Sequence, residues 1–140
     1  MGRSYWFECA KCGYRARVSG RADEGLSFVV QTILCRDCKE LYDAVTQLKV
    51  AEKTGGWGTF GSFRKGRTGK LHARIASPPA FQTVLNRLPP RGAKRLAWLP
   101  FEIRCPISAV HRVRSWNHPD RCPKCGLHLD KSALPYRLWD

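Results

Sequence analysis

Six of the seven cysteines in this 140-residue chain form three Cys-x-x-Cys pairs, and this spacing constrains the fold more than any other feature. Two intervening residues let both sulfurs of a pair face one ion, which is metal spacing rather than the spacing of a disulfide scaffold. A chain this short buries little apolar surface, so metal ions are the expected staples. A reducing cytoplasm is the expected compartment, because thiols stay available to metal there.

Two of these pairs predict a first metal site. Cys9 and Cys12 form one hook, Cys35 and Cys38 form the other, and the 22 residues 13–34 between them allow a strand, a turn and a returning strand. Four thiolates match tetrahedral zinc and leave no position open for water, so the expected ion is structural. A redox dithiol, an iron–sulfur cluster and a rubredoxin-type iron are the alternative uses of these cysteines.

The residues around the hooks predict a small antiparallel sheet and one helix. Residues 14–18 alternate apolar and basic side chains, and residues 26–34 are rich in β-branched and aromatic residues, as strands are. Residues 41–50 fit both a helix and a strand, and we expect a strand that completes the sheet. Apolar residues recur at helical spacing within residues 80–88, between two proline pairs that would end a short helix.

The order of these elements, with Cys9-Ala-Lys-Cys12-Gly13 as the first hook, resembles a zinc ribbon over residues 5–50. Cys122-Pro-Lys-Cys125-Gly126 looks like a further ribbon hook, and the closing LPYRLWD with the first module looks like a family of bacterial double zinc-ribbon proteins. The resemblance implies a small, mostly β, metal-stabilised fold. It implies metal binding but little biochemistry, because ribbons serve in transcription, in ribosomes and in scaffolds.

The expected organisation is two zinc ribbons, each a three-stranded antiparallel sheet, joined by a Gly-rich basic linker and one short helix. Residues 1–52 are the N-terminal ribbon with its four cysteines, and residues 53–76 are the linker. Residues 77–140 supply the short helix and an irregular C-terminal ribbon.

An imperfect internal repeat predicts the second metal site. Cys105-Pro-Ile-Ser108 aligns with Cys122-Pro-Lys-Cys125, so the first of these hooks has a serine in place of its second cysteine. Three thiols, from Cys105, Cys122 and Cys125, then need a fourth donor. Serine is a poor zinc ligand, whereas a site of three cysteines and one histidine is ordinary structural zinc chemistry.

His111 is the expected fourth donor, because it lies just past the defective hook. His118 and His128 are the second and third choices, and water in the open position is a further alternative. A degenerate site that holds no ion also remains open. The expected cofactor is therefore Zn²⁺, at the first site and also at this second one.

The positive charge of the chain is concentrated in its middle. The net charge is +14, and the segment from Lys53 to Phe101 holds ten Lys or Arg residues and no Asp or Glu. Such a segment attracts polyanions, although it can also be a solvated linker. Aromatic rings beside cations are typical of single-strand nucleic-acid binding. The predicted nucleic-acid-binding residues are Trp57, Phe60, Phe63, Arg64, Lys65, Arg67 and Lys70.

These features predict a zinc-binding protein that is not an enzyme and that binds RNA or DNA through its basic middle. The alternative is an adaptor that docks a protein partner on its ribbon faces. An enzyme is disfavoured because the sequence contains no recognisable nucleophile–base pair, phosphate loop or carboxylate pair, and no small-molecule substrate is expected. No membrane partner is expected, since the longest apolar stretches, such as residues 26–34, are too short to span a bilayer.

Overall fold

The computed structural model describes residues 1–51, 78–86 and 96–140, and the predicted basic linker lies outside them. The described residues form a mostly β protein with two antiparallel sheets and one short helix. The strands and the helix are β1 (Gly2–Glu8), β2 (Arg15–Val18), β3 (Ala22–Glu24), β4 (Phe28–Cys35), β5 (Glu40–Ala51), α1 (Phe81–Leu85), β6 (Leu96–Pro100), β7 (Val113–Ser115), β8 (Asp130–Lys131) and β9 (Arg137–Trp139).

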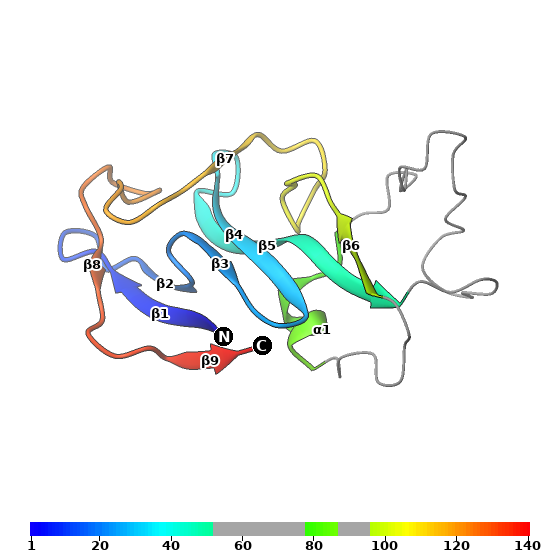
Figure 1. The fold of residues 1–140 in the computed structure, drawn as a ribbon. Helices are drawn as coiled ribbons and strands as arrows, with labels where there is room; N and C mark the ends of the chain where they lie inside the picture. Colours follow the sequence, from blue (N-terminus) through cyan, green and yellow to red (C-terminus); the bar gives the residue numbers. More distant parts are fainter. Residues whose placement is uncertain (52–77, 87–95) are drawn as a thin grey trace.

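The first sheet joins the beginning of the described chain to its end. Strand β1 pairs with β2 along one edge, with Trp6 opposite Arg17. Along its other edge β1 pairs with β8, where Phe7 lies opposite Lys131, and with β9, where Gly2 lies opposite Trp139. In Figure 1 the blue β1 and the red β9 accordingly lie side by side.

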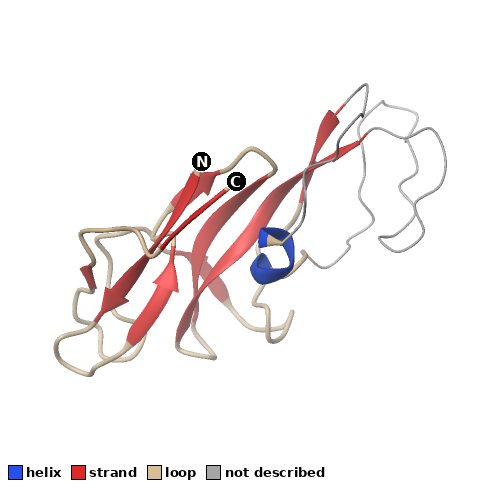
Figure 2. Ribbon diagram, turned by 90° about the horizontal axis from the view of Figure 1, so that it is seen from below, coloured by secondary structure: helices blue, strands red, loops and turns tan. Residues whose placement is uncertain are grey.

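The second sheet has the same mixed origin. Strands β3, β4 and β5 are consecutive in the chain, and β6 pairs with the far edge of β5. Strand β7 pairs with the cysteine end of β4, with Cys35 opposite Val113. The long, twisted pair β4–β5 runs through the middle of the molecule, with α1 beside it (Figure 2).

The predicted strands form, but they do not form one sheet. Residues 14–18, 26–34 and 41–50 supply β2, β4 and β5, and residues 80–88 contain the predicted helix. Strand β2, however, pairs with β1 in the first sheet, while β4 and β5 belong to the second. The expectation of one complete ribbon after another is therefore wrong, because each sheet combines strands from residues 1–51 with strands from residues 96–140.

Two buried clusters hold the sheets together. One surrounds Phe7 and includes Tyr14, Leu34 and Trp116, so it draws on both sheets. In the other, the Trp139 ring stacks on Phe28, with centroids 4.6 Å apart and planes 13° apart. No helix in the described ranges is long and apolar enough to cross a membrane.

A carboxylate on β5 ties the second sheet to the chain that follows β2. Asp43 accepts hydrogen bonds from the backbone N–H and the hydroxyl of Ser19, at 2.9 and 3.0 Å, and from the Thr32 hydroxyl at 2.6 Å. Burial raises the pKa of Asp43 to about 6, because desolvation outweighs these three donors, and the nearby Asp23 raises it further.

The contribution of Asp43 to the free energy of unfolding should therefore fall as the pH rises. In the unfolded chain this carboxyl ionises near pH 4, whereas in the fold it keeps its proton until about pH 6. Between these values the folded state binds more protons, so the free energy of unfolding decreases with pH. Urea unfolding should show that the free energy of unfolding of wild type, measured relative to that of Asp43→Asn, falls by about 1–2 kcal/mol from pH 4 to pH 6.5.

Asp43→Asn is the reference because metal-ligand protonation affects both proteins alike and cancels in the difference. A wild-type advantage that instead grows with pH would mean that the hydrogen bonds outweigh desolvation at Asp43.

Candidate metal centres

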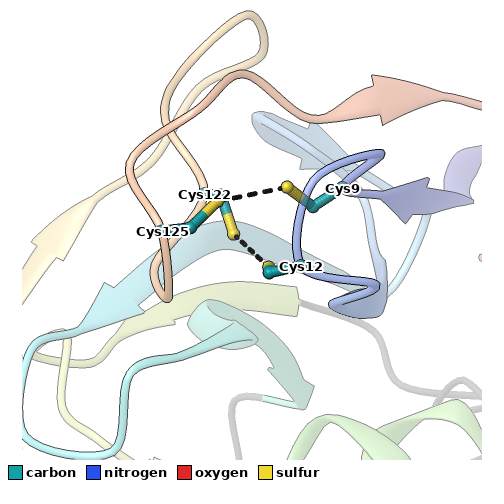
Figure 3. A group of neighbouring side chains, drawn as sticks. All are labelled: Cys9, Cys12, Cys122 and Cys125. Atoms are coloured by element: carbon teal, nitrogen blue, oxygen red, sulfur yellow. Dashed lines mark hydrogen bonds between the residues drawn. The ribbon is translucent and has the colours of Figure 1, made fainter.

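The first group of donors joins the turn after β1 to the loop before β8. Cys9 and Cys12 face Cys122 and Cys125 across a short gap (Figure 3). The Sγ atoms of Cys9 and Cys125 are 3.3 Å apart, and those of Cys12 and Cys122 are 3.7 Å apart. All four sulfurs lie within 4.8 Å of one another.

The two hooks of this first group have the same local geometry. Each ends in a glycine with positive φ, +70° at Gly13 and +80° at Gly126. Each glycine N–H donates to the carbonyl of the first cysteine of its hook, at 2.9 Å in one hook and 3.0 Å in the other. A left-handed residue closes such a turn without the steric cost that a side chain brings. The sequence Cys-x-x-Cys-Gly therefore presents two sulfurs on one side of each turn.

The second group joins the β4–β5 turn to the loop between β6 and β7. Its donors are Cys35, Cys38, Cys105 and His111, again all within 4.8 Å of one another. His111 Nδ1 lies 3.3 Å from Cys38 Sγ and 3.7 Å from Cys35 Sγ, and the Sγ atoms of Cys38 and Cys105 are 3.8 Å apart.

Two hydrogen bonds hold the histidine loop against the cysteine turn. The Arg36 N–H donates to the Arg112 carbonyl at 2.9 Å, and the Arg112 N–H donates to the Asp37 carboxylate at 2.7 Å. The first of these bonds continues the pairing of β4 with β7 by one residue. Together the two bonds place His111, which directly precedes Arg112, at the vacancy that Ser108 leaves in its hook.

The donor separations match one tetrahedral metal ion in each group. Sulfurs bonded to a common ion at about 2.3 Å lie about 3.8 Å apart at tetrahedral angles. A disulfide would need about 2.05 Å, and all seven cysteines are free. Amides also point at the sulfurs: the N–H groups of Cys38, Ile107 and Lys124 donate to Cys35, Cys105 and Cys122, each at 3.4 Å. Both groups can therefore hold a metal ion.

The thiol pKa values indicate that some of the cysteines in these groups ionise easily and that their neighbours then resist ionisation. Hydrogen bonding from the Cys12 backbone lowers the pKa of Cys9 to about 7. Burial opposes ionisation of Cys105, but amides of Ser108 and Ile107 outweigh it and lower its pKa to about 7. Burial and the neighbouring Cys35 and Cys105 thiols raise the pKa of Cys38 to about 11. One thiolate thus forms readily and opposes the next, and a divalent cation among them removes that repulsion.

The eight predicted ligands are the eight residues of these two groups, but their expected grouping is wrong. The hook spacing predicts that Cys9 and Cys12 meet Cys35 and Cys38, and that Cys105 and His111 meet Cys122 and Cys125. In the structure the first and last hooks of the chain meet each other. The second hook, with Cys35 and Cys38, meets the loop of Cys105 and His111. The sites are nested in the sequence because the donors of each site lie next to strands of one and the same sheet.

The other candidate histidines lie outside both groups. The His118 ring packs beside Phe7, with centroids 5.5 Å apart, and His128 is exposed at an isolated bridge to Arg121. The predicted nucleic-acid residues, from Trp57 to Lys70, all fall outside the described residues.

Comparisons of this chain with protein-family models, with curated proteins and with solved structures find no match.

Proposed function

We propose that this chain is a zinc-binding protein without enzymatic activity, in which two structural zinc ions each fasten an N-terminal segment of the chain to a C-terminal one. The observation that carries the proposal is the pair of donor groups, one of four cysteines and one of three cysteines and a histidine. Thiolate and imidazole are the donors that zinc favours at tetrahedral sites. Each group supplies four protein donors, which leaves no coordination position for a substrate.

We further propose that the zinc-stabilised fold serves to present a nucleic-acid-binding segment. The support is the charge distribution: ten cations and no anion between Lys53 and Phe101, whereas the rest of the chain holds 15 basic and 11 acidic residues. Thiolates bound to zinc bring those remaining residues still closer to neutrality. The middle segment then dominates the attraction of the protein for a polyanion.

The segment should give salt-dependent binding to single strands. If its cations neutralise phosphates, log affinity falls linearly with log salt, by roughly 0.7 per phosphate for single strands. Replacing Arg64, Lys65, Arg67 and Lys70 with alanine should flatten that slope by up to about 3. Fluorescence anisotropy with short RNA, single-stranded DNA and duplex DNA at several salt concentrations measures both quantities.

The aromatic residues provide a matched variant for this experiment. Replacing Trp57, Phe60 and Phe63 with alanine should weaken single-strand binding by about 1–3 kcal/mol per stacked base while leaving the salt slope nearly unchanged. Zinc content should stay at wild-type level in both variants, since neither removes a ligand. Wild-type protein that binds no nucleic acid even at low salt would refute the nucleic-acid proposal.

A protein adaptor is the second candidate function, and one feature of the described surface favours it. Ile107 and Val110, on the loop that carries Cys105 and His111, are 68% and 87% exposed. Apolar side chains at the tip of a rigid metal loop suit docking to a protein surface. An adaptor should retain its protein partner in both middle-segment variants.

A further inference from the structure

A preorganised arginine lies on the face of the first sheet that carries the Trp6 ring. Arg17 is the cross-strand partner of Trp6, and its guanidinium carbon lies 5.1 Å from the centroid of the Trp6 ring. The same carbon lies 5.3 Å from the Tyr136 ring, and Arg17 Nη1 donates to the Tyr136 hydroxyl at 3.1 Å. Trp6 and Tyr136 remain 39% and 45% exposed. Two rings thus fix a guanidinium whose other N–H donors can still meet a ligand.

A cleft of about 460 Å³ opens beside this arginine, between the first sheet, the start of β5 and helix α1. Its lining includes three arginines, Arg15, Arg17 and Arg137, together with Tyr136, Gln82 and one acidic residue, Glu40. Strand pairing explains the clustering, since Arg17 lies opposite Trp6 and Arg137 opposite Ser4, and alternate residues of β1 share one face. The volume is in the range of small-ligand sites.

The cleft has more positive than negative charge available to a ligand, which favours binding of an anion. Arg15 is paired with Glu8 at 2.9 Å, and Glu40 is paired with Lys124 at 3.0 Å. Within the described part of the chain, no carboxylate lies within ion-pair distance of Arg17 or Arg137. Arginine forks bind phosphate through paired charge-assisted hydrogen bonds. The aromatic rings next to them suit a planar group attached to that phosphate.

We infer that this cleft binds a phosphate of single-stranded nucleic acid through Arg17 and Arg137, with Trp6 and Tyr136 beside the adjoining base. The inference rests on the proposed nucleic-acid function and adds a contact site on the folded part of the protein. A single strand can direct one phosphate into a cleft and turn its base onto a ring, which a base-paired duplex does less readily.

The test compares two double variants of equal charge. Arg17→Ala with Arg137→Ala removes the two arginines, while Arg3→Ala with Lys131→Ala removes two exposed cations from the opposite face of the same sheet. The opposite face follows from the register, since Lys131 pairs with Phe7 and Arg3 is two residues from Tyr5 on β1. The zinc-loaded, 140-residue chain is titrated with a short single-stranded RNA and DNA, and zinc content confirms folding.

The cleft variant should bind single strands roughly tenfold to a hundredfold more weakly than wild type, because two charge-assisted contacts are lost. Its salt slope should flatten by roughly 0.7, for the one phosphate that the two arginines share. The control variant should bind within about threefold of wild type. Arg17→Lys with Arg137→Lys should recover part of the affinity, because it keeps the charges and loses the fork geometry.

Four outcomes would overturn the inference. If the cleft variant matches the control while the Arg64, Lys65, Arg67 and Lys70 variant loses binding, the proposed function stands and the cleft contact fails. If wild type binds no nucleic acid, both fail. A free mononucleotide bound as tightly as the strand rules out a strand site. Polyglutamate bound equally well, and lost in the same variant, assigns the cleft to an acidic protein instead.

Discussion

A chain in which Cys12 and Cys125 are both replaced by serine should retain one zinc ion per molecule, whereas a Cys12 and Cys38 double replacement should retain none. The first pair belongs to one donor group and the second pair spans both. The grouping expected from hook spacing predicts the opposite result for these same variants. Zinc measured by atomic emission after exhaustive dialysis therefore distinguishes nested sites from consecutive ones.

Single histidine variants complete the comparison. His111→Ala should lose one zinc ion, while His128→Ala should keep both, because its exposed imidazole lies outside the two groups. Full zinc in His111→Ala would show that another donor completes the second site.

Loss of either ion should also be costly for folding. Structural zinc contributes roughly 10–16 kcal/mol of apparent binding free energy in zinc-finger peptides near neutral pH, and much of it is folding free energy. A doubly substituted chain that unfolds would lose both ions whatever the grouping. Controlled oxidation of the zinc-loaded wild type then gives the answer, since the first disulfides form between sulfurs already in contact, such as Cys9 and Cys125 at 3.3 Å. Disulfides between Cys9 or Cys12 and Cys35 or Cys38 would contradict the nested arrangement.

Trp116→Ala should destabilise the protein by about 3–5 kcal/mol, the largest effect expected from any residue that binds no metal. This side chain is fully buried and meets Phe7 edge-on, with ring centroids 5.3 Å apart. Its indole N–H donates to the Arg121 carbonyl at 3.0 Å, one residue before Cys122. The substitution therefore leaves a cavity and frees the loop that carries half of the first metal site. Urea unfolding in excess zinc measures the loss.

Two further tryptophan variants serve as controls. Trp116→Phe keeps most of the apolar contact and leaves the Arg121 carbonyl without its donor, so a loss of about 1–3 kcal/mol is expected. Trp98→Ala removes a half-buried ring beside Lys49 and should cost about 1 kcal/mol. Equal losses for Trp116→Ala and Trp98→Ala would contradict the assignment of Trp116 to the core that joins the sheets.

Local chemistry made much of this protein predictable from its sequence. Cys-x-x-Cys-Gly is a self-contained turn, so the sulfurs of Cys9 and Cys12 converge whatever the rest of the chain does. The alternation in residues 14–18 and the β-branched run before Cys35 likewise act within a few residues, and they become β2 and β4. Even His111 could be identified, because its loop had to replace the sulfur that Ser108 lacks.

Tertiary structure alone decided which hooks meet and which side chains form the arginine cleft. A hook supplies two sulfurs and carries no signal for its partner; the partner follows from strand pairing, and β1 pairs with β8 more than 100 residues away in sequence. Arg17, Tyr136 and Arg137 likewise become neighbours only because β2 and β9 lie on opposite edges of β1. Hook geometry comes from short-range backbone constraints, whereas ligand grouping comes from long-range pairing and burial, which no local spacing encodes.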